Sequence, residues 1–248
     1  MYSDALIDHL RSADRVAVLT GAGISAESGI PTFRDPGGIW EKFEPQELAN
    51  VEAFLENPEL VQGWYRHRRQ VVEDAEPNDG HRALVRLEQH VDLVTTITQN
   101  VDDLHNRAGS SEVVEFHGNI TRNYCTDCEQ DVDAARIDAA IEDGQPATCP
   151  ECEGLVRPDV VWFGEMLPPD AMDRASEATT TCDVFLSVGT STVVYPAARL
   201  PMLAKEAGAY VVEVNPDRTP ISGNVDEYLA GPAGEVLPAI LSSLDKAA

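Results

Sequence analysis

Basic residues are scarce in this sequence. The chain has 248 residues, and its 18 lysines and arginines face 43 aspartates and glutamates, which gives a formal net charge of −25. A surface with this excess of carboxylates repels phosphate backbones and anionic lipid head groups. We therefore expect neither direct nucleic-acid binding nor a role at a membrane surface, although single basic sites stay compatible with this charge.

Long apolar segments are also missing. No run approaches the ~18 apolar residues of a membrane-spanning helix. The N-terminus, Met1-Tyr2-Ser3-Asp4, lacks the basic and apolar regions of a secretory signal. Hydrophobic residues still make up 43% of the chain, which is enough for a sizeable core. These observations predict a soluble, cytoplasmic protein of one or two domains.

Cysteines number only five, but four of them form two Cys-x-x-Cys pairs. The pairs are Cys125/Cys128 and Cys149/Cys152, with 20 residues between them. In a cytoplasmic chain this spacing favours a four-thiolate zinc site, and a site with four protein ligands is structural because no position is open to substrate. Two unrelated redox or free-thiol pairs are the weaker interpretation. Cys182 is expected to be a small buried residue.

Short apolar runs alternate with amphipathic segments along most of the chain. This alternation is typical of an α/β fold with a doubly wound parallel, Rossmann-like sheet, in which ligands bind at the carboxyl ends of the strands. Strands are expected at residues 15–20, 93–98, 113–116, 160–163, 184–188 and 210–214. Helices are expected at residues 4–12, 79–90, 170–181, 196–207 and 234–246.

Two stretches interrupt this alternation. Residues 35–78 look helical and loop-like, and residues 119–157 hold the paired cysteines without any long apolar run. Together they predict a smaller domain that consists of a helical insertion and a four-cysteine zinc module. The larger, Rossmann-like domain is then expected to comprise residues 1–34, 79–118 and 158–248.

A glycine turn follows the first predicted strand. Gly21-Ala22-Gly23 would let the backbone approach a phosphate group closely. The third glycine of the dehydrogenase fingerprint is absent, because Ala26 stands at that position. On its own the turn fits nucleotide binding and a simple tight turn about equally, and it disfavours a hydride-transfer dehydrogenase.

Polar residues follow two further predicted strands. His117 comes directly after residues 113–116, and Gln99, Asn100 and Asp102 come after residues 93–98. An imidazole at this edge of a sheet can accept a proton near neutral pH. From position alone, a structural histidine and an ordinary polar turn remain open.

A longer string identifies the family that this sequence resembles. Residues 21–34, GAGISAESGIPTFR, closely resemble the signature of the sirtuins, which are NAD-dependent protein lysine deacylases. The family's later motifs follow in order: Thr98–Asp102, His117-Gly118, the cysteine pairs, Val161–Glu165, Gly189–Ser191 and Asn215–Asp217. The resemblance covers about residues 10–235. It implies that NAD is consumed as a co-substrate, that each chain holds one structural zinc ion, and that acylated-lysine proteins or peptides are the partners.

The resemblance also implies roles for individual residues. His117 corresponds to the general base, and Asn100, with Asp102, to residues that hold nicotinamide and ribose. An acyl-lysine peptide would pair as a strand beside Val161, Phe163 and Gly164. The implied cofactor-binding residues are Gly21, Ala22, Gly23, Ala26, Glu27, Thr32, Phe33, Arg34, Trp40, Gln99, Asn100, Val101, Asp102, Gly189, Thr190, Ser191, Asn215, Pro216, Asp217 and Ala233.

The spacing of Tyr65 and Arg68 puts both on one helix face. A solvated basic face is the plain interpretation, since three arginines fall within four positions here. The Tyr-x-x-Arg pattern also resembles the class III sirtuins of bacteria and archaea, which remove succinyl and malonyl groups, because a guanidinium and a phenol can bind a carboxylate. Pro36 departs from that pattern, in which a small residue, often alanine, opens the acyl pocket.

Three functions are compatible with these motifs. The leading one is an NAD-dependent lysine deacetylase and desuccinylase or demalonylase that produces nicotinamide, O-acyl-ADP-ribose and free lysine. A protein ADP-ribosyltransferase of the same family is the first alternative. A catalytically inactive zinc-ribbon and nucleotide-binding interaction module is the second, and the presence of His117, Asn100 and Asp102 counts against it.

Overall fold

The computed structural model of this chain describes residues 2–32 and 48–245. Phe33, Arg34, Pro36 and Trp40 of the predicted site lie outside the described residues. Within them, six parallel strands form one sheet in the order β3-β2-β1-β6-β7-β8. The strands are β1 (Arg15–Thr20), β2 (Leu93–Thr98), β3 (Val113–Glu115), β6 (Val184–Val188), β7 (Tyr210–Asn215) and β8 (Glu227–Ala230). The predicted doubly wound α/β fold is therefore confirmed.

The order of the strands creates a switch point between β1 and β6. From β1 the chain continues through β2 and β3 to one edge of the sheet, and from β6 it continues through β7 and β8 to the other. Thr20 at the end of β1 is in register with Thr98 of β2 and Val188 of β6, so these three strands end level. In α/β sheets such a point is where ligands bind.

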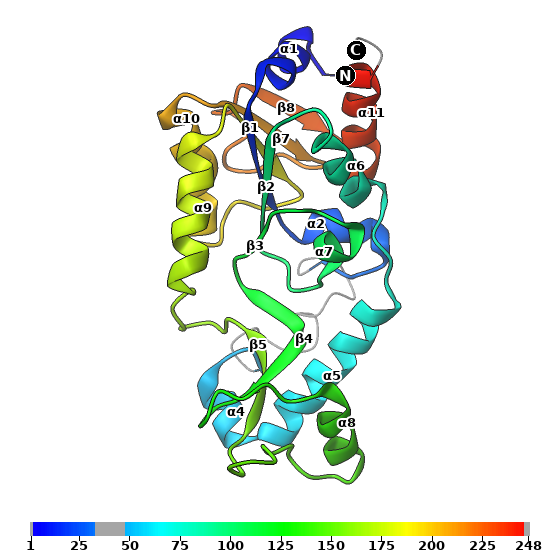
Figure 1. Cartoon of the computed structure of the whole chain (residues 1–248), viewed down its shortest axis with the longest axis vertical. Coiled ribbons are helices and arrows are strands. Elements are labelled where there is room, and N and C mark those ends of the chain that lie inside the picture. Colours follow the sequence, from blue (N-terminus) through cyan, green and yellow to red (C-terminus); the bar gives the residue numbers. More distant parts are fainter. Residues whose placement is uncertain (1, 33–47, 246–248) are drawn as a thin grey trace.

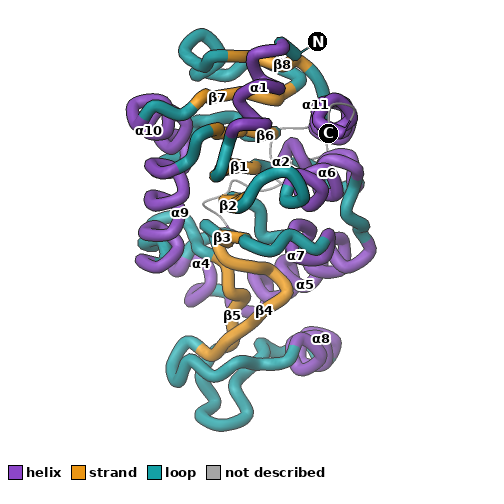
Figure 2. The backbone as a smooth tube through the Cα atoms, turned by 45° about the horizontal axis from the view of Figure 1, so that its top comes forward, coloured by secondary structure: helices purple, strands orange, loops and turns teal. Residues whose placement is uncertain are grey.

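Helices cover both faces of the sheet (Figures 1 and 2). Successive side chains of a strand point to opposite faces, so Val16 and Val18 pack in one core while Ala17 and Leu19 pack in the other. The first core is closed by α1 (Asp4–Ser12), α6 (Asp79–Leu87) and α11 (Ala233–Asp245), and the second by α9 (Pro169–Thr181) and α10 (Leu200–Ala207). Short helices are α2 (Ala22–Ser25), η1 (Ala26–Ser28), α7 (Leu104–Ala108) and η3 (Ala197–Arg199). None of the helices in the described ranges is both long and apolar enough to cross a membrane.

A second, smaller group of elements lies beyond the β3 edge of the sheet (Figure 1). It contains the antiparallel pair β4 (Gly118–Cys125) and β5 (Val156–Val160), together with α4 (Val51–Glu56), α5 (Pro58–Asp74) and α8 (Ala134–Glu142). Phe54, Tyr65 and Trp162 belong to one of its cores, and the two buried cysteines belong to the other. The domain boundaries drawn from the sequence stay a prediction.

The strand expected at residues 160–163 is the clearest correction. β5 ends at Val160 and belongs to the antiparallel pair, so no strand of the parallel sheet lies there. The apolar run misled because burial alternates along it: Trp162 is 2% exposed in the smaller core, whereas Phe163 is 51% exposed. Conversely, β8 was not predicted, because Glu-Tyr-Leu-Ala is a short edge strand with a polar start.

Candidate active site

A cavity of ≈ 1240 Å³ opens at the switch point. Its lining comes from the turns after β1, β2, β6 and β7 and from the segment after β5. It thus lies between the large sheet and the smaller group of elements. Sequence reasoning had expected ligands at this edge of the sheet.

Most of the predicted site residues that the structure describes line this cavity. From the cofactor set these are Gly21, Ala22, Gly23, Ala26, Thr32, Gln99, Asn100, Val101, Gly189, Thr190, Ser191, Asn215, Pro216 and Asp217. From the other sets they are His117, Tyr65, Arg68, Val161, Phe163 and Gly164.

Three predicted cofactor residues lie outside the lining. Glu27 accepts a hydrogen bond from the backbone N–H of Gly234 (2.7 Å), which ties η1 to the start of α11. Ala233 is buried in the core that α11 shares with the sheet. Asp102 is buried behind the cavity, where its carboxylate accepts hydrogen bonds from the Ser25 hydroxyl (2.6 Å) and the Leu104 N–H (3.1 Å).

The glycine turns allow two loops to meet at the cavity floor. A Cβ atom on Gly21 would stand 2.8 Å from the Cα of Thr190, and one on Gly23 would stand 2.7 Å from the Cα of Gly189. The Gly23 N–H donates to the Gly189 carbonyl at 2.8 Å, which fixes the contact. Any larger residue would force the turns after β1 and β6 apart, so the glycines let these two turns form a narrow backbone cradle at the cavity.

Asn100 is held by a polar network behind this cradle. Its amide donates to the Gly21 carbonyl and to the Ser25 hydroxyl, both at 3.1 Å, and Ser25 in turn donates to Asp102. Burial raises the pKa of Asp102, although the hydrogen bonds from Ser25 and Leu104 oppose that shift. The network fixes the Asn100 side chain at the cavity wall before any ligand binds.

His117 has a defined tautomer in this site. Its Nδ1 lies 3.0 Å from the carbonyl oxygen of Gln99. Because a carbonyl only accepts hydrogen bonds, Nδ1 must bear the proton, and Nε2 is left with its lone pair. Burial lowers the pKa of His117, partly offset by the Gln99 hydrogen bond, so the ring is neutral at pH 7. The arrangement is that of a general base.

The backbone explains why His117 lies at this point. It stands between β3 and β4, and its carbonyl accepts the Val161 N–H at 3.0 Å. The next residue, Gly118, has φ +79, and a Cβ there would lie 2.1 Å from the Asp159 carbonyl oxygen. Only glycine allows this turn from the large sheet into the antiparallel pair, with the histidine at the junction.

Tyr65 and Arg68, both on α5, also line the cavity. The Arg68 guanidinium lies 4.7 Å from the centre of the Trp64 ring and 5.4 Å from that of Tyr65. Burial lowers the pKa of Arg68, and the Tyr65 phenol opposes the shift. Across residues 2–32 and 48–245, no carboxylate lies within salt-bridge distance of this guanidinium. By contrast, Arg66 and Arg69 on the same helix pair with Asp138.

Sequence reasoning missed several residues of the lining. Trp162 and Glu165 belong to a motif that was recognised, but only their neighbours were assigned. Val193, Val194 and Tyr195 form an exposed apolar segment of the same lining, with Tyr195 76% exposed. The signal for them was their place directly after the Gly189–Ser191 turn.

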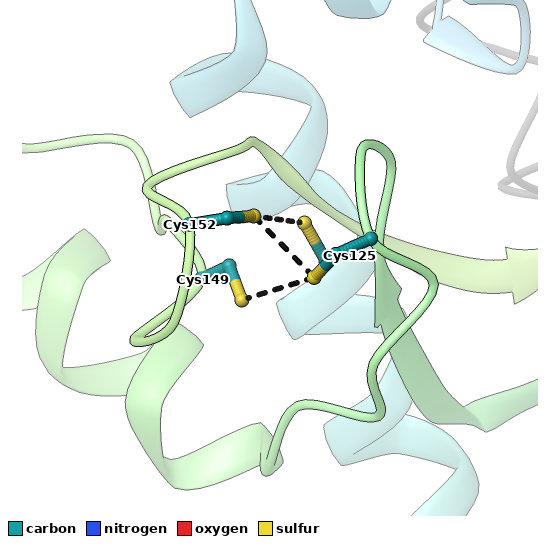
Figure 3. Close-up of side chains that lie close together, drawn as sticks. Cys125, Cys149 and Cys152 are labelled. Carbon is teal, nitrogen blue, oxygen red and sulfur yellow. Dashed lines mark hydrogen bonds between the residues drawn. The ribbon is translucent and has the colours of Figure 1, made fainter.

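The four paired cysteines converge on one point in the smaller group (Figure 3). All four Sγ atoms lie within 4.8 Å of one another, and three of the distances are 3.3, 3.4 and 3.7 Å. Zinc–sulfur bonds of about 2.3 Å in a tetrahedron require sulfur atoms about 3.8 Å apart. The donor set and its size therefore fit one structural zinc ion, as predicted.

The comparisons with known proteins agree with this geometry. The model of the Sir2 family matches residues 21–196. The NAD-dependent protein deacylase 2 of Pyrobaculum aerophilum is 50% identical over 96% of this chain and 94% of its own length. A crystal structure of a Sir2 homologue–NAD complex superposes with a TM-score of 0.92 at 44% identity, over 100% of this chain and 95% of the other. A Sir2–p53 peptide–NAD⁺ structure gives 0.89 at 33% identity, over 98% of each chain.

Proposed function

Because this chain belongs to the Sir2 family, the sirtuins, we propose that it is an NAD-dependent protein lysine deacylase. In this reaction NAD supplies a ribose carbon whose bond to nicotinamide breaks, and the acyl group of lysine is transferred to ADP-ribose. The observation on which the proposal rests is that His117 lines the cavity and that its Nδ1 lies 3.0 Å from the Gln99 carbonyl oxygen, which leaves Nε2 to accept a proton. His117 would accept the proton of a ribose hydroxyl.

The cofactor would lie along the turns after β1, β6 and β7. The backbone cradle of Gly21, Gly23 and Gly189 would hold the pyrophosphate, and Asn215, which lines the same cavity, would contact the adenosine. Asn100 and Gln99 would contact the nicotinamide and ribose, because both directly follow β2 and line the cavity together with His117. Their amides are already oriented by Gly21 and Thr190, so little side-chain entropy is lost on binding.

The acyl-lysine peptide would lie beside Val161–Gly164. Hydrogen bonds from Val161 to His117 and from Phe163 to Ala49 fix this segment, both at 3.0 Å. Val161 directly continues β5, whereas Phe163 and Gly164 form a turn that exposes the apolar Phe163 side chain. A peptide would pair as a strand at Val161 and pack against Phe163. The related structure with a p53 peptide and NAD⁺ supports a peptide substrate.

A cytoplasmic location stays a prediction. It agrees with the four-cysteine site, because a reducing compartment keeps the zinc-binding thiolates from forming disulfides.

The acyl group that fits the Tyr65 and Arg68 wall is an acidic one. Arg68 is a half-buried cation without a carboxylate partner among the described residues. Tyr65, which is 3% exposed, places a phenol next to this guanidinium. A succinyl or malonyl carboxylate would supply the missing negative charge and accept hydrogen bonds from both groups. We therefore propose that the enzyme removes acidic acyl groups as well as acetyl.

A panel of acetyl-, succinyl- and malonyl-lysine peptides tests the activity. With NAD, we expect each peptide to lose the mass of its acyl group while nicotinamide and O-acyl-ADP-ribose appear, as measured by mass spectrometry. A peptide that becomes heavier by ADP-ribose would instead show a transferase. Peptide binding without release of nicotinamide would show an inactive interaction module.

Replacing Arg68 with methionine tests the acidic-acyl proposal. We expect the succinyl-to-acetyl ratio of kcat/KM to fall by about 10²-fold, because a buried hydrogen bond to a charged group contributes roughly 1.5–3 kcal/mol. Arg66→Met is the matched control, since Arg66 is on the same helix but pairs with Asp138 and Glu142 away from the cavity. If both variants change the ratio equally, or neither does, Arg68 does not recognise the acyl carboxylate.

A further inference from the structure

Trp162 makes a buried hydrogen bond to the acyl-recognition wall, the name used here for Tyr65 and Arg68 on α5. Its indole Nε1–H donates to the phenol oxygen of Tyr65 at 2.8 Å. The two residues come from distant parts of the chain, the segment after β5 and the middle of α5. Trp162 is 2% exposed and Tyr65 is 3% exposed, so water does not compete for this hydrogen bond.

This hydrogen bond decides what the phenol can do. Burial raises the pKa of Tyr65, so its side chain remains a neutral phenol that can donate one proton. Because the indole already donates to the phenol oxygen, the phenol's own O–H must point away from Trp162. In the part of the chain that the structure describes, no protein acceptor is within hydrogen-bond distance of that O–H. A ligand oxygen in the cavity beside Arg68 would be the acceptor.

A single ion pair holds the indole in place. The Arg157 guanidinium stacks 3.5 Å from the centre of the Trp162 ring and donates to Glu165 through two nitrogens, at 2.6 and 2.8 Å. Glu165 also accepts the backbone N–H of Trp162 at 2.7 Å. The Arg157 side chain is 8% exposed and that of Glu165 is 25% exposed, so the guanidinium is the more strongly shielded partner of this pair. Both the ring and the backbone of Trp162 are therefore fixed by the same two residues.

We propose that Trp162, fixed by the Arg157–Glu165 pair, is a positioning residue that makes Tyr65 an obligatory hydrogen-bond donor to acidic acyl groups. The inference rests on the proposed acidic-acyl recognition and deepens it. Trp162 acts through Tyr65 and need not touch the acyl carboxylate. Without the indole N–H, the phenol can rotate its hydroxyl, and the donor is no longer oriented before substrate binds.

Trp162→Phe is the direct test, because it keeps an aromatic ring and removes only the N–H donor and the second ring. We expect the succinyl-to-acetyl ratio of kcat/KM to fall by about 10-fold, mainly through the KM for the succinyl peptide. In a Tyr65→Phe background the same substitution should change the ratio less than twofold, because the phenol through which Trp162 acts is gone.

Phe54→Leu is the matched control. Phe54 packs against the same indole, with ring centres 5.1 Å apart, but makes no contribution to the N–H bond. We expect its ratio to stay unchanged while its melting temperature falls. If Trp162→Phe does not fold, Arg157→Lys provides a second variant, which loses the stacking on the indole and is expected to lower the ratio by about threefold.

The outcomes separate this inference from the proposed function. If Arg68→Met abolishes the preference for succinyl but Trp162→Phe does not lower it, Trp162 has no positioning role and the acyl recognition stands. An equal effect of Trp162→Phe with and without the phenol, or a Phe54→Leu effect of the same size, also overturns the inference. If the wild type and Arg68→Met show the same ratio, the acidic-acyl proposal itself fails, and the inference fails with it.

Discussion

Replacing His117 with alanine is expected to lower kcat/KM for acyl-lysine peptides by about 10³-fold or more, because the reaction loses its general base. The release of deacylated peptide, followed by mass spectrometry, measures this loss. Binding of NAD should persist, since the backbone cradle does not depend on the imidazole, and calorimetry can check this. A variant that keeps more than a tenth of the wild-type activity would show that another group removes the ribose proton.

The pH dependence of the wild type follows from the same histidine. Burial lowers the pKa of His117 from its ordinary value of 6.5. A base works in its unprotonated form, so a lowered pKa keeps the enzyme active at more acidic pH than an exposed histidine would allow. The acid limb of the kcat/KM profile is therefore expected below pH 6.5, and a limb above it would contradict the assignment.

Much of the large sheet was predictable from local sequence. β1 and β2 were predicted at their observed bounds because five of the six residues in each strand are buried, which leaves a continuous apolar or small-residue signal. The turns that follow these strands were predicted to bind ligands because the carboxyl ends of parallel strands meet at one edge of the sheet. The family resemblance, which the comparisons confirm, then named the chemistry.

The smaller group of elements was less predictable because its stability comes from contacts between distant segments. Gln62 shows this: its side chain bonds to the backbone of Ala147 and Val156, which are 85 and 94 residues away. The Arg157–Glu165 pair and the Trp162–Tyr65 bond likewise depend on how β5 packs against α5. The hydrophobic periodicity of the sequence does not reveal such contacts. The apolar run at 160–163 even predicted a strand of the parallel sheet, whereas β5 belongs to the antiparallel pair.

Glu213 is another residue whose role no local pattern revealed. It is fully buried on β7, and its two carboxylate oxygens accept hydrogen bonds from the hydroxyls of Thr219 and Ser222. These bonds fix the loop after β7, from which Asn215, Thr219 and other residues line the cavity. In the sequence Glu213 is simply a charged residue within an apolar strand, and only the folded loop provides its partners.

Removal of zinc is expected to unfold the smaller group of elements. Its core beside the cysteines contains few apolar side chains, among them Val132, Ile137 and Val156, so burial alone offsets little of the chain entropy. Structural zinc sites contribute roughly 10–16 kcal/mol of apparent binding free energy. We therefore expect a strong chelator to lower the melting temperature by well over 10 °C and to release one zinc ion per chain, as measured by calorimetry and metal analysis.

Cys128→Ser and Cys182→Ser form a matched pair for this experiment. Cys128 belongs to the cluster, so its loss should release the metal and reproduce the effect of the chelator. Cys182 lies outside the cluster, and burial raises its pKa to about 11, so it stays a thiol and its serine variant should keep full zinc content. If the protein keeps its fold and its melting temperature after the chelator has removed the metal, the zinc ion has no structural role.

The consequence of zinc loss should extend to the choice of acyl group. Gln62 joins α5 to the zinc module through hydrogen bonds of 2.6 to 3.0 Å, and α5 also carries Tyr65 and Arg68. Once the module unfolds, α5 loses these partners, and the acyl-recognition wall loses its support. Partly chelated samples should therefore lose succinyl hydrolysis before they lose NAD binding, because the cradle belongs to the large sheet. Parallel loss of both would show that the two parts of the molecule unfold together.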